Sequence, residues 1–230
     1  MTEQEVSNFV LNLTYEDVQD ENGIDLTQID GRLSTSPTDR VRQLESFVEL
    51  MNRQKQGNEM IDPDLKLREI LELLQREGVE FVIVGGVAAW LNGSELPTRD
   101  LDVCCRMTEE NMSRFANAIR AMDARLRDPR KIAPPFDTAT LVKLKMLLLR
   151  TPLGDFDLVP EVLAVGKYDE VLKNSVEKVV EGRIVRVLNI GALIAAKKVL
   201  TRPKDKLALI HLEAAKKKQE IERKQPGLFE

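Results

Sequence analysis

The stretch Val84–Val103, VGGVAAWLNGSELPTRDLDV, sets two glycines directly after an apolar run and two aspartates at the start of the next one. Val79–Val84 is rich in β-branched residues and predicts a strand, Val87–Asn92 predicts a short helix closed by Gly93, and Leu101–Arg106 predicts a second strand. The stretch therefore predicts a strand–helix–strand unit with glycines and acids at its junctions. Packing alone does not require that combination.

Helix and turn signals continue on both sides of this unit. Apolar residues at helical spacing, with capping residues at the ends, predict helices over Ser36–Gln54, Asp62–Gly78, Thr108–Met122, Ile190–Leu200 and Pro203–Glu222. Further strands are expected over Thr138–Arg150 and Asp155–Pro160, joined by a Pro-Gly turn, and in a hairpin over Val176–Leu188 that turns at Glu181-Gly182. Residues 1–33 show no sustained periodicity. This mixed order predicts an α+β fold with a mainly antiparallel sheet flanked by helices.

Composition excludes several classes of protein. The longest apolar runs of the 230-residue chain are far shorter than the roughly 20 residues that span a bilayer, and its N-terminus lacks a basic region followed by an apolar stretch. We therefore expect a cytoplasmic protein without a membrane partner. The net charge of −4 argues against a protein that coats nucleic acid. Basic residues crowd the segment from Lys197 to Lys224, which fits either a solvated helix face or a surface that faces phosphates.

Cysteine and histidine are too few for several kinds of site. Cys104 and Cys105 are adjacent on a predicted strand, where successive side chains point to opposite faces, so we expect them to pack rather than to bridge. The single histidine, His211, lies in a helical pattern. These features argue against a disulfide framework, a histidine-rich metal cluster and a Ser-His-Asp triad.

Three acids form the strongest chemical signal. Asp100 and Asp102 are two residues apart on a predicted strand, so they share one face with Cα atoms about 6.5–7 Å apart. Carboxylates this close repel each other unless a cation lies between them, and hard oxygen ligands suit Mg²⁺. Asp157, between Phe156 and Leu158, offers a third carboxylate on a strand expected to lie nearby. Asp155 shares that strand face and is the competing candidate for the third acid. Asp157 is preferred, because its apolar neighbours place it deeper in the domain.

The glycine pair suggests what the acids act on. Gly85 and Gly86 lie at a strand-to-helix junction, where a backbone without Cβ atoms can approach a triphosphate or simply make a tight turn. A metal-dependent nuclease also uses clustered acids. The glycine pair and Lys197 suit a triphosphate better than a polymer backbone, and an aromatic content of 4% leaves few side chains on which bases can stack.

These residues resemble the signature of the DNA polymerase beta-like nucleotidyltransferase superfamily. The shared pattern is an apolar residue, Gly85-Gly86, then Asp100-Leu101-Asp102-Val103, and a later acid strand at Phe156-Asp157-Leu158. The segment LIAAKKVLTRPKDKLALIHLE is similar to the minimal nucleotidyltransferases related to abortive-infection toxins. The resemblance covers roughly Val79 to Glu213. At the position after the first glycine the superfamily often has Ser, and this chain has Gly86.

The resemblance implies a nucleotidyltransferase fold and the transfer of a nucleoside monophosphate from a nucleoside triphosphate to a hydroxyl acceptor. Asp100, Asp102 and Asp157 would hold two Mg²⁺ ions, Gly85 and Gly86 would hold the triphosphate, and Lys197 would neutralise charge on pyrophosphate. Further nucleotide contacts are expected from Thr98, Arg99, Arg202, Lys204 and Asp205.

The resemblance also frames the domains and partners. We expect an N-terminal extension over residues 1–60, a nucleotidyltransferase core over 61–188 and a helical C-terminal segment over 189–230. The implied acceptor is RNA such as tRNA, a protein or a small molecule, and a toxin of this kind would have an antitoxin as partner. The alternative is a catalytically degenerate module of the same fold that binds a nucleotide or regulates a partner.

Overall fold

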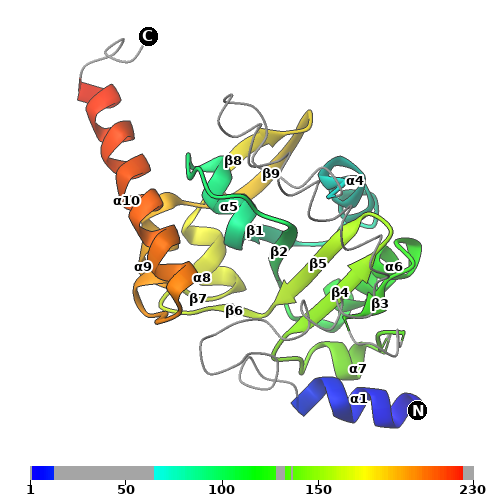
Figure 1. Cartoon of the computed structure of the whole chain (residues 1–230). Coiled ribbons are helices and arrows are strands. Elements are labelled where there is room, and N and C mark those ends of the chain that lie inside the picture. Colours follow the sequence, from blue (N-terminus) through cyan, green and yellow to red (C-terminus); the bar gives the residue numbers. More distant parts are fainter. Residues whose placement is uncertain (1, 13–64, 128–132, 136, 225–230) are drawn as a thin grey trace, which may run out of the picture.

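A computed structural model describes residues 2–12, 65–127, 133–135 and 137–224 (Figure 1). Its main sheet has seven strands in the order β3-β4-β5-β2-β1-β9-β8. These strands are β1 Phe81–Val84, β2 Asp100–Cys105, β3 Arg125–Leu126, β4 Leu147–Thr151, β5 Gly154–Val159, β8 Ser175–Val180 and β9 Arg183–Leu188. A separate two-stranded sheet joins β6 Glu161–Val162 to β7 Gly166–Lys167.

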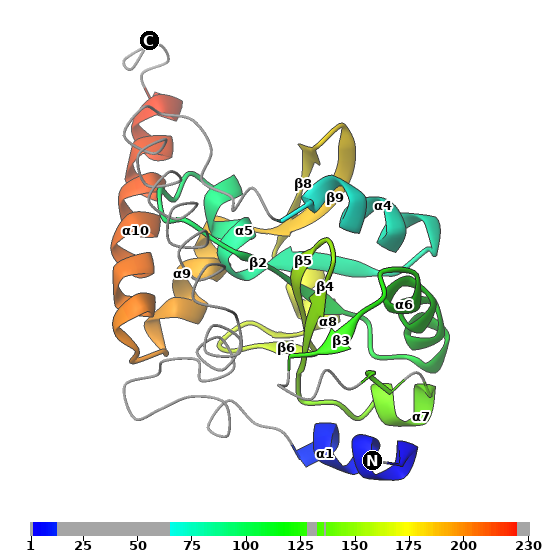
Figure 2. The ribbon, with the colours of Figure 1, turned by 45° about the vertical axis from the view of Figure 1, so that its right-hand side comes forward.

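Helices flank this sheet. They are α1 Glu3–Asn12, α4 Leu67–Arg76, α5 Gly85–Leu91, α6 Glu109–Ala121, α7 Thr138–Leu141, α8 Tyr168–Lys173, α9 Ile190–Lys198 and α10 Pro203–Lys224. In Figures 1 and 2, α9 and α10 lie together at one side of the molecule, and α4 and α6 lie at the opposite side. The helix predicted over Ser36–Gln54 lies outside the described residues, as does most of the predicted N-terminal extension.

The pairing of the strands confirms the predicted α+β class with a mixed, mainly antiparallel sheet. Strand β2 runs parallel to β5, and β1 runs parallel to β9. The pairs β1–β2, β3–β4, β4–β5 and β8–β9 are antiparallel. The central position of β2 and β5 places the acids of both strands in the middle of the sheet.

The predicted strand–helix–strand unit is present. Every residue of β1 is buried, as expected for its continuous apolar run. Helix α5 begins at Gly85 itself, earlier than predicted, and Gly93 follows it in the left-handed region at φ 94°. Asn92 secures the end of this helix, because its side-chain amide donates to the carbonyls of Ala88 at 2.7 Å and Leu188 at 3.0 Å.

The strand predicted over Thr138–Arg150 is wrong in its first half. Thr138–Leu141 forms α7, because the Asp137 side chain accepts a hydrogen bond of 2.7 Å from the Thr140 N–H and so caps a helical turn. The strand begins only at Leu147. The Pro-Gly turn is where it was expected, since Thr151 pairs with Gly154 at the end of the β4–β5 hairpin.

The second hairpin and the last two helices agree with the sequence. Glu181 and Gly182, at φ 50° and 75°, form the two-residue turn between β8 and β9. Helices α9 and α10 have almost the predicted bounds. His211 lies partly exposed on α10, as expected.

The apolar core extends from one end of the described chain to the other. One cluster of buried side chains includes Val6 and Val10 of α1, residues of β1, β2, β5 and β9, and Leu212 of α10. On the core face of the sheet, the rings of Phe115 on α6 and Phe156 on β5 lie 5.9 Å apart. The opposite side chains of β5, including Asp157, therefore point to the other face of the sheet.

The two cysteines pack in this core, as predicted. Cys104 and Cys105 are free thiols with no measurable exposure. Burial, with a smaller contribution from Glu161, raises the pKa of Cys104 to about 12, and burial also raises the pKa of Cys105. Both thiols are therefore protonated and inert at neutral pH.

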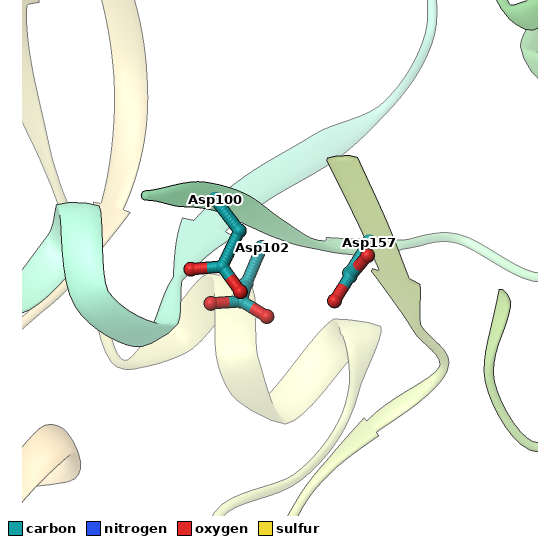
Figure 3. A group of neighbouring side chains, drawn as sticks. All are labelled: Asp100, Asp102 and Asp157. Carbon is teal, nitrogen blue, oxygen red and sulfur yellow. The ribbon is translucent and has the colours of Figure 1, made fainter. Parts of the chain in front are cut away.

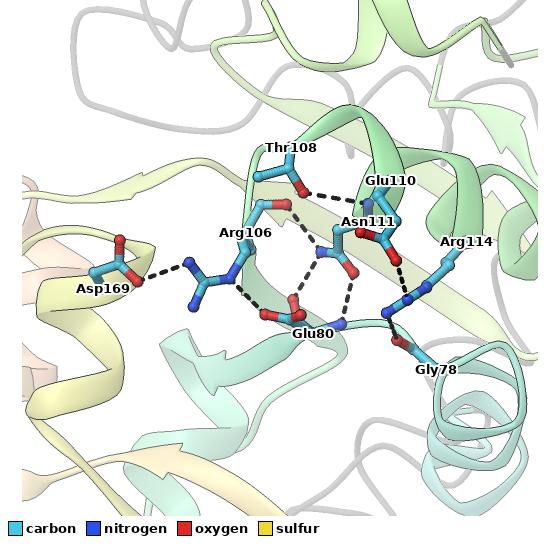
Figure 4. Close-up of polar contacts among 8 residues, drawn as sticks. All are labelled: Gly78, Glu80, Arg106, Thr108, Glu110, Asn111, Arg114 and Asp169. Carbon is cyan, nitrogen blue, oxygen red and sulfur yellow. Dashed lines mark hydrogen bonds and ion pairs between the residues drawn. The ribbon is translucent and has the colours of Figure 1, made fainter.

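A polar network closes the end of the β1–β2 pair that is remote from the glycines (Figure 4). The buried Asn111 side chain accepts from the Glu80 N–H at 2.7 Å and donates to the carbonyls of Glu80 at 3.0 Å and Arg106 at 2.9 Å. The Arg106 guanidinium pairs with Glu80 at 2.5 Å and Asp169 at 3.0 Å, and it lies 4.6 Å from the centre of the Tyr168 ring. The ends of both strands are thus hydrogen-bonded although the chain leaves the sheet there.

Candidate active site

Three carboxylates converge where β2 and β5 lie side by side. Asp102 pairs in register with Asp157, and Asp100 precedes Asp102 by two residues on the same face. One oxygen from each of the three side chains lies within 4.8 Å of the others. Figure 3 shows the carboxylates of Asp100 and Asp102 side by side, with one oxygen of Asp157 directed toward them. The three acids meet as the sequence predicted.

The structure also distinguishes the two candidates for the third acid. Asp155 pairs in register with Asp100, but its carboxylate turns to Arg150, with 3.0 Å between Oδ1 and Nε. Asp157 is 5% exposed and lies in the cluster. Asp157 is therefore the acid that joins Asp100 and Asp102, as preferred from its apolar neighbours.

The glycine pair leaves space for side chains of the site. A Cβ atom on Gly85, at φ 61°, would lie 1.9 Å from Oδ2 of Asp102, and a Cβ atom on Gly86 would lie 2.2 Å from Oγ1 of Thr98. A serine at position 86 would meet the same contact. The Thr98 hydroxyl in turn lies 3.3 Å from the carbonyl oxygen of Asp100 and 3.4 Å from its Oδ1. Both glycines are thus required for the acids to sit where they do.

The charge of Asp102 is poorly compensated. Burial and the nearby Asp100 carboxylate raise the pKa of Asp102 to about 7, against the opposing effects of Lys197, Arg127 and a hydrogen bond from the Gly86 N–H. Burial likewise raises the pKa of Asp157 well above its usual range; Arg127 opposes that shift, and the neighbouring acids add to it. The three acids therefore carry more negative charge than the neighbouring cations compensate, which is the condition that favours binding of a further cation.

Arg127 is a member of the site that the sequence did not identify. Its side chain is 1% exposed, and its Nη2 lies 2.5 Å from Oδ1 of Asp157. The backbone N–H of Arg127 donates to the carbonyl of Leu148, which itself pairs in register with Asp157. Arg127 thus reaches the site through β3 and β4. No local pattern marks it, because the short strand β3 was not predicted.

Lys197 belongs to a second charged group at the edge of the site. Its Nζ lies 2.6 Å from Oδ1 of Asp205, whose other oxygen pairs with Arg202. Burial opposes the charge of Asp205, but the hydrogen bonds and charges of Arg202 and Lys197 outweigh it and lower the pKa of Asp205. Asp205 is fully buried. It therefore positions the two cations, rather than offering a free carboxylate to a ligand.

A cavity of about 570 Å³ joins these groups. Its lining includes the acids, the glycines and the cations: Gly85, Gly86, Asp100, Asp102, Asp157, Lys197, Arg202, Lys204 and Asp205. Aliphatic side chains also line it: Leu148, Val159, Val162, Leu163, Leu193, Val199 and Leu200. A volume of this size is typical of small-molecule sites.

Two of the expected nucleotide contacts do not line this cavity. Thr98 is buried beneath Gly86 and Asp100, where its hydroxyl approaches the backbone and side chain of Asp100. Arg99 is partly exposed beside the acid strand, outside the cavity wall. The other nine of the eleven predicted residues lie in the wall.

The donor set fits a divalent cation. Carboxylate oxygens from three side chains, at a site open to a cavity, match the ligands that Mg²⁺ or Mn²⁺ takes together with phosphate oxygens. Among the described residues, the cluster that could hold a metal contains no cysteine or histidine, which disfavours zinc. A cation there would compensate the negative charge that makes burial of the three carboxylates unfavourable.

No helix in the described ranges combines the length and apolar character needed to cross a membrane. In a comparison with models of known protein families and with curated protein sequences, nothing matches this chain.

Proposed function

We propose that the protein is a Mg²⁺-dependent nucleotidyltransferase with the fold of the DNA polymerase beta-like superfamily. The observation that carries the proposal is the convergence of Asp100, Asp102 and Asp157 at a cavity that also contains Gly85, Gly86 and Lys197. The cavity has room for a small ligand, and its lining combines acids that suit a cation with cations that suit phosphate.

The reaction requires the oxygen of an acceptor hydroxyl to form a bond with the α-phosphorus of a nucleoside triphosphate. The bond from that phosphorus to the bridging oxygen of the β-phosphate breaks, and pyrophosphate leaves. The acceptor proton passes to a carboxylate of the cluster or to water. A divalent ion, when bound, would neutralise the phosphate oxygens.

The chain's own residues have separate roles in this scheme. Asp100 and Asp102 would hold the ion, and the Thr98 hydroxyl, which contacts Asp100, would orient it. Lys197, Arg202 and the exposed Lys204 face the leaving pyrophosphate, with Asp205 fixing the first two. The aliphatic residues of the lining contact the nucleoside and exclude water.

The test is transfer of label from an α-labelled nucleoside triphosphate to total RNA, tRNA or cellular protein in the presence of Mg²⁺. Label should appear on the acceptor with one equivalent of pyrophosphate, and Asp102→Asn should abolish both. Asp169→Asn is the matched control, because this acid lies at the other end of β2 beside Arg106. Equal labelling by wild type and Asp102→Asn would refute the proposal.

A catalytically degenerate module that binds a nucleotide is the second candidate. The observation that favours it is that two of the site's cations are already paired with acids, Arg127 with Asp157 and Lys197 with Asp205. Calorimetry distinguishes the two. The degenerate module would bind a triphosphate without releasing pyrophosphate for any acceptor, and Asp100→Asn would not change its affinity.

The proposed toxin role is a special case of the enzyme. Expression of the wild type would then arrest growth, and Asp102→Asn would relieve the arrest. A housekeeping transferase would be tolerated in both forms. Co-purification of an antitoxin with the wild-type chain would be expected only for the toxin.

A further inference from the structure

Helix α10 has one side in the core and another side that faces outward. Asp205 and Leu212 are fully buried on its inner side, and Ala208 lines the cavity. Leu207 and Ile210 lie on the other side, with 48% and 64% of their surface exposed. In Figures 1 and 2, α10 lies at the outside of the molecule, with α9 beside it. The outward side of α10 therefore presents a pair of apolar side chains to solvent.

The spacing of these residues makes a continuous apolar stripe. Residues three and four apart lie on one face of a helix, and the exposed Ala214 follows Ile210 by four residues. Spacing of three and then four residues is that of the seam between two packed helices. The stripe over Leu207, Ile210 and Ala214 thus suits contact with a second helix.

Two opposite charges lie along one flank of the stripe. Lys206 and Glu213 are both exposed and are seven residues apart, so they lie on the same side of the helix about two turns from each other. Glu213 contacts Lys198, with 3.3 Å between Oε1 and Nζ, but both side chains are more than half exposed. A carboxylate in that position can accept from a further cation. The flank therefore offers a cation at one end and an acid at the other.

This arrangement is complementary to itself. An antiparallel second copy, related by a two-fold axis between Leu207 and Ile210, sets Leu207 against Ile210 of the partner subunit. Lys206 then lies about 3 Å along the helix axis from Glu213 of the partner subunit, which is within the reach of these side chains. The symmetry axis generates the same ion pair a second time.

Other partners fit this surface less well. Phosphates of RNA would be attracted by Lys206 and repelled by Glu213, and a uniformly acidic protein face would meet the same obstacle. Neither partner would use the apolar stripe together with both charges. A second copy of the chain matches all three features.

We propose that two copies of this chain associate through antiparallel α10 helices, with Leu207 and Ile210 at the centre and Lys206–Glu213 ion pairs on the flank. The proposal goes beyond the proposed function and does not depend on it, because Asp205 and Ala208 line the cavity from other sides of the helix. A contact between one helix of each copy is smaller than a standard protein interface, so the association is weak and reversible.

Sedimentation velocity of the full chain tests the association. The wild type should sediment faster as its concentration rises from about 1 to about 300 μM, as a weak dimer does. Leu207→Gln/Ile210→Gln should sediment as a monomer throughout. The matched control is Val179→Gln, because Val179 is 73% exposed on the β8–β9 hairpin. This control should associate like the wild type. A wild type that stays monomeric, or a control that also loses association, would overturn the proposal.

Charge reversal tests whether the partner is a second copy in this orientation. Lys206→Glu and Glu213→Lys each turn both flanking attractions into repulsions, so each should weaken self-association about tenfold at low salt. In a mixture of the two variants, one copy carries two acids and the other carries two lysines, so both attractions return. The mixture should therefore form a dimer with about the wild-type affinity. Single variants that associate like the wild type, or a mixture that stays monomeric, would refute the antiparallel contact.

Discussion

The β1–β2 strand pair has two polar ends. At one end, Asn111 hydrogen-bonds the backbone of Glu80 and Arg106, and Arg106 links two acids (Figure 4). At the other end, three carboxylates meet, and the pKa of Asp102 rises to about 7 through burial and the charge of Asp100 (Figure 3). At the first end the polar groups form hydrogen bonds and ion pairs with one another, whereas the second end brings three acidic side chains together.

This difference separates stability from function along one pair of strands. A buried network with every partner present stabilises the fold, whereas a cluster of partly compensated acids costs stability and is retained where a ligand supplies the missing charge. Variants at the Asn111 end should therefore affect unfolding, and variants at the acid end should affect binding and transfer. Each prediction below tests that division.

The largest effect is expected for Asp102→Asn. In the proposed transferase, removal of a charged ligand of the ion should lower the rate of nucleotidyl transfer by about a thousandfold or more, because the charge acts on the transition state. The same change removes a destabilising charge, so the melting temperature without divalent ions should stay constant or rise. Pyrophosphate release and thermal unfolding measure the two effects. A large fall in melting temperature would contradict the division between the two ends.

Asn111→Ala should produce the opposite pattern. It removes three hydrogen bonds to buried backbone groups and should lower the free energy of unfolding by about 3 kcal/mol. Transfer per folded molecule should not change. Urea denaturation measures the loss, with Asn117→Ala as control, because Asn117 is exposed on the same helix. Equal stability of the two variants would show that the network contributes little.

Gly85→Ala and Gly182→Ala form a matched pair with a smaller effect. Both glycines have positive φ, 61° and 75°, so each substitution costs about 1 kcal/mol of backbone strain. A Cβ atom on Gly182 meets nothing within 4 Å, whereas one on Gly85 meets the Asp102 carboxylate. Only Gly85→Ala should displace Asp102 and weaken Mn²⁺ binding. Loss of binding in both variants would mean that strain, rather than the contact, is responsible.

The parts of the molecule that could be predicted are those with local causes. The period of two on a strand places Asp100 and Asp102 on one face, and glycines mark the turn at 181–182 and the end of α5. Asp157 could be chosen over Asp155 because its neighbours are apolar. In each case the deciding interaction lies within a few residues of the chain.

The parts that could not be predicted depend on pairing between distant segments. Arg127 reaches Asp157 only because β3, a two-residue strand, pairs with β4. The contact of Lys197 with Asp205 requires α9 to pack against α10. These contacts change the interpretation of residues that were correctly identified. Asp205 positions cations, and Lys197 shares its charge with a buried acid.

A further expected effect is a dependence of stability on pH. The pKa of Asp102 is about 7 in the folded chain, through burial and the charge of Asp100, against 3.8 for an ordinary aspartate. Between those values the folded state binds a proton that the unfolded state has released, so stability falls as pH rises toward 7 and levels off above it. Asp102→Asn removes this loss.

The measurement is urea denaturation in the presence of a chelator. The stability of Asp102→Asn relative to wild type should increase from pH 5 to pH 8, whereas the difference in stability between Asn111→Ala and wild type should stay constant. Addition of Mg²⁺ should restore the wild type at pH 8. A difference that does not change with pH would mean that Asp102 carries its charge without cost, and the contrast between the two ends of the strand pair would not hold.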